Sequence, residues 1–123
     1  MSARILILED DAVLSEMLRY LLETKGFQVK TAASGQDALA LASEFKPRVL
    51  LLDIMLPDGN GLDFLEKLRL DAAQAALRVF VMSTVKSKSM RERAESLGAL
   101  VYVAKPFEPH AFVAQIEKAA ALP

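Results

Sequence analysis

The feature that most constrains the fold is an unbroken apolar run that ends in a single carboxylate. Residues 48–53 read Arg-Val-Leu-Leu-Leu-Asp, and a loop containing Pro57, Gly59 and Gly61 follows at once. A strand inside a parallel sheet is covered on both faces, so it is apolar along its length and does not alternate. Residues 48–53 are therefore expected to form a central strand. Asp53 then lies at its carboxyl end, where open α/β sheets place their ligand sites.

A second apolar run also ends in acidic residues. Residues 4–8 are followed by Glu9, Asp10 and Asp11. If the two strands are neighbours, Glu9, Asp10 and Asp53 converge on one site. Two like charges ~4 Å apart repel by roughly 4 kcal/mol at an effective dielectric of about 20, so either a carboxyl pKa rises or a divalent cation binds. A ligand set of oxygen atoms, without histidine or cysteine, favours Mg²⁺.

Strand-like runs alternate with helical patterns along the chain. The other expected strands are residues 28–32, 78–83 and 100–104. The expected helices are 12–25, 34–45, 61–70, one that begins near Ser89 and one that begins at Pro109. Such alternation implies right-handed crossovers and a parallel sheet covered on both faces, and the chain is too short for an eight-fold barrel. The sequence therefore predicts a five-stranded, doubly wound α/β fold.

Local signals predict where these helices begin and which faces they bury. Asp11 is expected to cap the first helix and Gly26 to end it. Ser34 and Ser89 each begin a capping-box pattern, for the second and fourth helices. Pro109 is expected at the first position of the last helix. The expected inner face of the first helix comprises Val13, Leu14, Met17, Leu18, Leu21 and Leu22.

Composition excludes several classes of protein. Lys plus Arg (15) and Asp plus Glu (16) nearly cancel, so no overall charge favours nucleic acid or an anionic membrane. The chain has no cysteine, which excludes a thiolate site and suits a reducing cytoplasm. No apolar run approaches the ~20 residues of a membrane span. We therefore expect residues 1–123 to be one cytoplasmic domain, either a whole protein or the N-terminal part of a longer one.

Two further strand ends carry groups that suit phosphoryl transfer. Ser83 and Thr84 end the fourth expected strand, and Lys105 follows the fifth. A carboxylate nucleophile, a divalent metal, a hydroxyl and an ammonium group together can transfer a phosphoryl group. In this interpretation Asp53 attacks phosphorus, while the metal and Lys105 neutralise the equatorial oxygens. The hydroxyl group hydrogen-bonds to the phosphoryl product.

Together these residues resemble the receiver domain of bacterial two-component response regulators. The resemblance runs from Arg4 to about Ala121 and rests on motifs that occur in order and in register. They are Glu9-Asp10, Leu52-Asp53-Ile54-Met55-Leu56-Pro57 with Gly59 and Gly61, Ser83, Gly98-Ala99 and Lys105-Pro106-Phe107. The resemblance implies a flavodoxin-like fold of five strand–helix units, with a five-stranded parallel sheet in the order 2-1-3-4-5. It also implies a cis peptide bond between Lys105 and Pro106.

The same resemblance implies a phosphorylation-activated signalling switch and not a metabolic enzyme. Asp53 is the expected acceptor of a phosphoryl group from the phosphohistidine of a sensor histidine kinase or phosphotransfer protein. Glu9, Asp10 and Asp53 are expected to hold Mg²⁺ together with the backbone carbonyl of Met55. Of these acids, Asp10 is expected to bind the ion directly. Lys105 is expected to contact the phosphoryl group.

The resemblance also identifies switch residues and an output surface. Ser83 matches the family's switch hydroxyl, and Tyr102 matches the aromatic residue that rotates between two states. The surface around Tyr102 is expected to engage a downstream output domain or protein, without direct contact with nucleic acid or membrane. The formation of a phosphorylation-dependent homodimer is left as an alternative. However, Leu100 and Val101 stand where the subfamily that dimerises through its fourth and fifth helices often has paired acids.

Other functions compete with this interpretation. A phosphatase or phosphotransferase that works through an aspartyl phosphate typically has a second Asp two places after the nucleophile, where this chain has Met55. A flavin- or nucleotide-binding protein of the same fold would carry a Gly-rich phosphate loop after the first strand, and none is present. The remaining alternative is a phosphate-independent docking or dimerisation module. An intact set of site residues argues against it: Glu9, Asp10, Asp53, Ser83 and Lys105.

Overall fold

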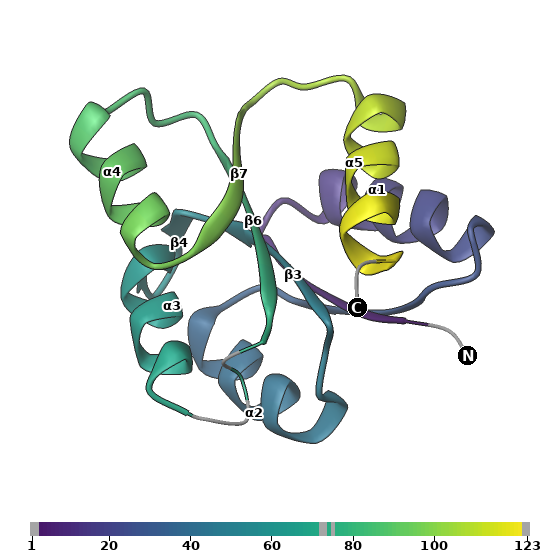
Figure 1. Ribbon diagram of the computed structural model, residues 1–123, viewed down its shortest axis with the longest axis horizontal. Helices are drawn as coiled ribbons and strands as arrows, with labels where there is room; N and C mark the ends of the chain where they lie inside the picture. The colour runs from purple at the N-terminus through teal and green to yellow at the C-terminus, as the bar shows by residue number, and fades with distance from the viewer. Residues whose placement is uncertain (1–2, 72–73, 75, 122–123) are drawn as a thin grey trace.

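A parallel sheet divides this computed structural model into two helical layers (Figure 1), and the structure describes residues 3–71, 74 and 76–121. Within these residues five strands pair in the order β2-β1-β3-β6-β7, and every pairing is parallel. The strands are β1 (Arg4–Leu8), β2 (Gln28–Ala32), β3 (Val49–Asp53), β6 (Arg78–Ser83) and β7 (Ala99–Ala104). Strands β4 (Met55–Leu56) and β5 (Gly59–Asn60) form a separate small hairpin, so β6 and β7 are the fourth and fifth strands of the main sheet. The order is therefore the predicted flavodoxin-like 2-1-3-4-5.

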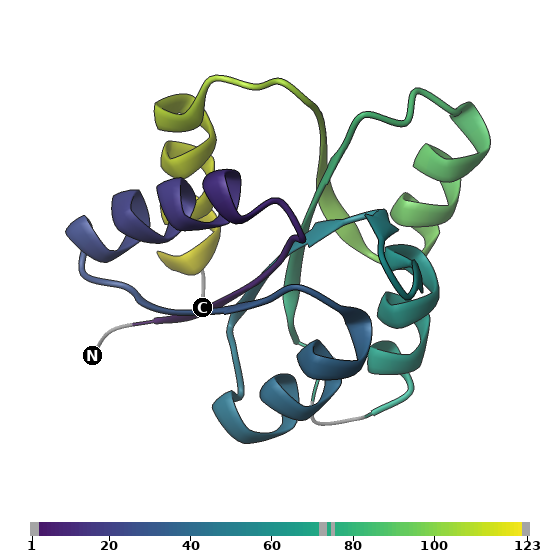
Figure 2. The same ribbon diagram turned by 180° about the vertical axis from the view of Figure 1, so that it is seen from behind.

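Helices cover both faces of the sheet. The helices are α1 (Ala12–Thr24), α2 (Gly35–Phe45), α3 (Gly61–Arg69), α4 (Lys88–Ser96) and α5 (Pro109–Ala121). As Figures 1 and 2 show, α1 and α5 lie on one face, and α2, α3 and α4 lie on the other. Successive side chains of a strand point to opposite faces, so Ile5 and Ile7 pack beneath α1 and α5 while Leu6 and Leu8 pack on the opposite side. None of the described helices is both long and apolar enough to cross a membrane.

The buried face of α1 is narrower than the sequence indicates. Leu18 and Leu22 are fully buried, but Val13 is 81% exposed and Met17 37% exposed. The prediction that Val13 and Met17 face inward is therefore wrong. The six apolar residues occupy two adjacent rows of the helix surface, and only one row faces the sheet. The other row, continued by the 67%-exposed Tyr20, faces solvent.

The helix caps confirm two predictions and correct one. The Oδ1 atom of Asp11 accepts a hydrogen bond from the Val13 N–H (3.0 Å), so Asp11 caps α1 as expected. Ser34 likewise caps α2. The prediction that Ser89 caps α4 is wrong, because Ser87 does so: its Oγ accepts from the Met90 N–H at 3.3 Å. Ser87 has the extended backbone that a cap requires, so the helix begins before Ser89.

Candidate functional site

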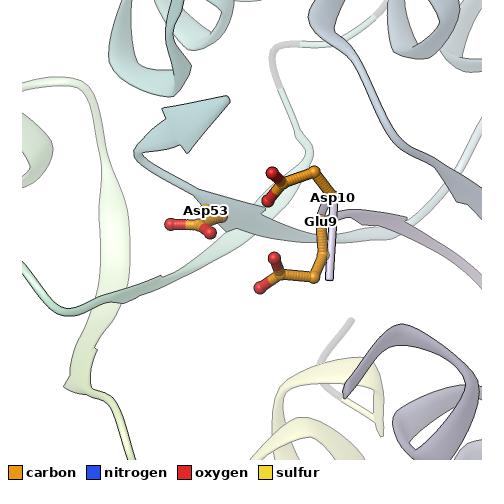
Figure 3. Close-up of side chains that lie close together, drawn as sticks. All are labelled: Glu9, Asp10 and Asp53. Atoms are coloured by element: carbon orange, nitrogen blue, oxygen red, sulfur yellow. The ribbon is translucent and has the colours of Figure 1, made fainter. Parts of the chain in front are cut away.

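Three carboxyl groups meet at the carboxyl edge of the sheet. Glu9 and Asp10 follow β1 and Asp53 ends β3, the neighbouring strand; Figure 3 shows their side chains together. One carboxylate oxygen of each residue lies within 4.8 Å of the others. Glu9 and Asp53 are buried, whereas Asp10 is exposed. The structure thus brings together the acids that the sequence analysis placed at two strand ends.

Lys105 joins this cluster from the end of β7. Its Nζ atom donates hydrogen bonds to Oε1 of Glu9 and, at 2.9 Å, to Oδ2 of Asp53. Burial by itself would lower the pKa of Lys105, but the hydrogen bonds to Glu9 and Asp53 raise it. The side chain is therefore a cation at neutral pH. The Lys105–Pro106 peptide bond is cis, as predicted.

Glu9 is the acid that its surroundings perturb most clearly. Burial raises the pKa of Glu9 to about 7, and the charge of Asp53 acts in the same direction, against hydrogen bonds from Lys105 and the Asp11 N–H. Both Glu9 oxygens are engaged, one by Lys105 and the other by the Asp11 N–H at 3.0 Å. The exposed Asp10 is better placed to bind an incoming ion directly. A cluster of carboxylate oxygens with this excess of negative charge fits Mg²⁺.

The segment after Asp53 is a hairpin, although the sequence analysis expected only a loop. Strands β4 (Met55–Leu56) and β5 (Gly59–Asn60) pair antiparallel, and Pro57 and Asp58 form the turn. The N–H of Met55 donates to Oδ1 of Asp53 at 3.2 Å. The base of the hairpin therefore orients the carboxylate and places the backbone of Met55 beside it.

Gly61 allows α3 to begin directly against Asp53. Its N–H donates to the carbonyl oxygen of Ile54 at 2.6 Å. A Cβ atom at Gly61 would overlap the backbone carbonyl oxygen of Asp53. This close approach requires a residue without a side chain, so Gly61 sets the position of Asp53 from the side of α3.

Asp58 is a contributor that the sequence analysis missed. Its carboxylate accepts hydrogen bonds from the N–H groups of Gly35 (2.9 Å) and Gln36 (3.0 Å), at the start of α2. These two bonds lower the pKa of Asp58. The Pro57-Asp58-Gly59 sequence is a turn signal, but it carries no information about a helix more than twenty residues away.

Ser83 and Tyr102 both bind the short segment between β6 and α4. Ser83 is fully buried, and its Oγ accepts a hydrogen bond from the Val85 N–H at 2.9 Å. The Tyr102 hydroxyl donates to the Val85 carbonyl oxygen at 2.7 Å. The Arg91 guanidinium lies 4.8 Å from the centre of the Tyr102 ring. The two predicted switch residues therefore meet through Val85, which the sequence analysis did not single out for this role, and Thr84 is exposed beside it.

The sequence matches known proteins along nearly its whole length. The model of the response regulator receiver domain family matches residues 5–117. The phosphate regulon transcriptional regulatory protein PhoB of Klebsiella pneumoniae is 37% identical over 117 residues, which are 95% of this chain and 51% of that protein. The DNA-binding response regulator MtrA of Mycolicibacterium paratuberculosis is 39% identical over 118 residues, 94% of this chain and 50% of that protein. The chain thus spans about half the length of these relatives.

Solved structures agree with the architecture. The non-phosphorylated HemR receiver domain from Leptospira biflexa superposes with a TM-score of 0.91 at 30% identity, covering 99% of this chain and 97% of that one. The chemotaxis response regulator CheY4 of Vibrio cholerae gives a TM-score of 0.89 at 24% identity, covering 97% of this chain and 99% of that one. At that identity the second likeness concerns the fold alone.

Proposed function

This chain belongs to the response regulator receiver domain family, whose members are phosphorylation-dependent signalling switches, and from this premise we propose that Asp53 accepts the phosphoryl group. The observation that carries the proposal is the setting of the Asp53 carboxylate. The carboxylate is buried at a strand end. Its Oδ2 atom accepts a hydrogen bond from Lys105, and its Oδ1 atom accepts one from the Met55 N–H. These bonds fix its orientation next to the exposed Asp10.

The proposed reaction moves one phosphoryl group between two proteins. An oxygen of Asp53 forms a bond to phosphorus as the bond from phosphorus to the donor histidine nitrogen breaks, and the imidazole leaves with that electron pair. Lys105, which already donates to Asp53, then neutralises charge on the phosphoryl oxygens. Hydrolysis of the acyl phosphate by water restores Asp53. The domain is a signalling module that promotes its own phosphorylation, not a metabolic enzyme.

We assign Mg²⁺ as the cofactor, held by Glu9, Asp10, Asp53 and the backbone carbonyl of Met55. Receiver domains generally bind Mg²⁺ at an acidic pocket, and the clustered carboxylates here are compatible with it. The bound ion supplies positive charge that offsets the charge of the transferring group. Asp10 is exposed and provides a direct ligand, whereas Glu9 is buried and hydrogen-bonded to Lys105.

The phosphodonor is a sensor histidine kinase or phosphotransfer protein, and we propose that it docks on α1. Val13, Met17 and Tyr20 recur at helical spacing and are exposed. A groove of about 330 Å³, lined in part by Met17, Lys105 and Phe107, continues this apolar row to the site. A cytoplasmic location suits this partner and a sequence without cysteine.

The output partner is a downstream domain or protein that contacts the surface around Tyr102. Leu100 on β7 is 54% exposed and apolar, whereas Val101 packs partly against the core. This composition favours an apolar patch on the partner over a salt-bridged homodimer. Sedimentation of the phosphorylated domain distinguishes the two, because a tight dimer whose affinity falls steeply with salt would contradict the apolar partner.

Phosphorylation by a small acyl phosphate tests the assignment of Asp53. Wild type incubated with the donor and Mg²⁺ should gain one phosphoryl group by intact mass, and Asp53→Asn should gain none. An adduct that persists in Asp53→Asn would overturn the assignment.

Asp10→Ala should lose Mg²⁺ binding in calorimetry more completely than Asp11→Ala, because Asp11 caps α1. Equal losses in the two variants would contradict the proposed metal site.

A further inference from the structure

The hairpin beside Asp53 is attached at its tip to a helix that is distant in sequence. Asp58 lies in the turn, and its two carboxylate oxygens accept from Gly35 and Gln36, which precede it by 23 and 22 residues. The distances of 2.9 Å and 3.0 Å are those of well-formed hydrogen bonds. Asp58 therefore links the segment that follows the acceptor to α2.

This contact completes the N-terminus of α2. The first amides of a helix have no acceptor within the helix. Ser34, the helix's own cap, takes only the Asp37 N–H, at 3.3 Å. The two preceding amides are bonded by the carboxylate of Asp58. An anionic acceptor at a helix N-terminus is favoured by the helix dipole as well as by the hydrogen bonds.

The hairpin needs such an anchor. Its ladder consists of two residue pairs, Met55 with Asn60 and Leu56 with Gly59, and an isolated short hairpin is marginally stable. Yet its first residue orients Asp53, because the Met55 N–H donates to Oδ1. An attachment at the tip restrains the whole hairpin, including the backbone of Met55 at its base.

We propose that Asp58 is a positioning residue for the acceptor site. By capping α2 from the tip of the hairpin, it fixes Met55 and, through the Met55 N–H, the carboxylate of Asp53. Asp58 does not touch the reacting atoms, and its carboxylate is engaged by α2. The inference rests on the proposed function, in which Asp53 and the Met55 carbonyl form the metal and phosphoryl site.

The test compares variants that separate positioning from helix capping. Asp58→Ala removes both bonds, and Asp58→Asn keeps the shape but leaves one oxygen to accept. Ser34→Ala removes a cap from the same helix without touching the hairpin, and Asp37→Asn removes the same charge from the same helix turn. Two readouts are taken: hydrogen exchange of the Met55 amide in metal-free protein, and the Kd for Mg²⁺ by NMR titration.

We expect Asp58→Ala to speed exchange of the Met55 amide about tenfold and to raise the Kd for Mg²⁺ about tenfold. Asp58→Asn should change both quantities in the same direction but by less. It takes the place of Asp58→Ala in the test if Asp58→Ala does not fold. Ser34→Ala and Asp37→Asn should change both quantities by less than about twofold, because among the described residues neither side chain forms a hydrogen bond or ion pair with the hairpin.

The proposal is overturned if both Asp58 variants leave Met55 exchange and Mg²⁺ affinity unchanged. It is equally overturned if Ser34→Ala produces the same changes, since the effect would then be helix capping alone. A wild type that binds no Mg²⁺ would overturn the proposed function. In that event the exchange of Met55 in metal-free protein still decides whether Asp58 positions the hairpin.

Discussion

Two segments border the acceptor carboxylate, and they are held very differently. The first is the β3–α3 loop, residues 54–60, which connects β3 to α3 and contains the β4–β5 hairpin. Asp58 ties its tip to α2, and Gly61 packs its end against the backbone of Asp53. The second, residues 84–87 between β6 and α4, is the β6–α4 loop. Its middle is held through Val85, by neutral hydrogen bonds to Ser83 and Tyr102.

The difference separates a fixed part of the site from an adaptable one. The β3–α3 loop is held by a carboxylate and by close packing, which makes displacement of Asp53 costly. The β6–α4 loop is held by two neutral bonds on a half-buried backbone, each worth about 1 kcal/mol net. A switch needs only a few kcal/mol of differential interaction to change its populations. We therefore expect phosphorylation to move the β6–α4 loop while the β3–α3 loop stays in place.

Gly61→Ala should have the largest effect, because it attacks the fixed side. Besides overlapping the Asp53 carbonyl, the new Cβ would lie 3.0 Å from Cδ1 of Leu52. We expect a loss of about 3 kcal/mol in the free energy of unfolding in urea. Gly26→Ala is the control: it has open space but a φ of 92°, so it should cost about 1 kcal/mol. Equal losses would show that close packing at Gly61 does not matter.

Ser83→Ala tests the adaptable side. It removes the acceptor of the Val85 N–H and should cost about 1–2 kcal/mol, while Asp53 still takes up phosphate. Phosphorylation should change the NMR chemical shifts around Tyr102 less than in wild type, because the hydroxyl group that hydrogen-bonds to the phosphoryl group is absent. Ser43→Ala, at an exposed position on α2, is the control. Full wild-type shifts in phosphorylated Ser83→Ala would refute the role of the hydroxyl.

Strong acid should release the tip of the β3–α3 loop from α2. The pKa of Asp58 is lowered from 3.8 by its bonds to the Gly35 and Gln36 amides. Its stabilising contribution is therefore complete above pH 3.8 and is lost as the pH falls through the lower, folded-state value. The amide shifts of Gly35 and Gln36 should titrate with a midpoint below 3.8 in wild type and not in Asp58→Asn. A midpoint at or above pH 3.8 would contradict the stabilisation of the Asp58 carboxylate by these two hydrogen bonds.

Arg91→Ala should give the smallest effect. The guanidinium stacks on the Tyr102 ring, and an exposed cation–π pair contributes about 0.5–1 kcal/mol. We expect faster exchange of the β6–α4 loop in relaxation dispersion, with little change in Mg²⁺ affinity. Lys88→Ala is the control, because it removes a charge from the same helix. Lys88 is exposed and forms an ion pair with Glu92 at 3.8 Å. Equal effects in both variants would rule out a specific role for the stacking.

The sequence by itself determined the sheet, its strand ends and the residues gathered there. Apolar runs identify buried strands because both faces are covered, and a carboxylate that ends such a run must lie at the sheet edge. Glu9, Asp10 and Asp53 could be placed at that edge on this basis, and Lys105 was expected there too. That β1 and β3 are neighbours did not follow from the apolar runs: the family resemblance implied the strand order, and the structure confirms it. Helix N-caps such as Asp11 could also be predicted from the sequence, because capping depends on neighbours within one helical turn.

Tertiary structure alone decided how these pieces constrain one another. Whether Val13 faces the sheet depends on which of two apolar rows of α1 meets it, and periodicity does not distinguish the rows. The pairing of Asp58 with the start of α2 depends on where two separate segments lie in space. The meeting of Ser83 and Tyr102 at Val85 has the same origin. Local pattern fixes what each segment is, whereas contacts between distant segments arise only when the whole sheet has formed.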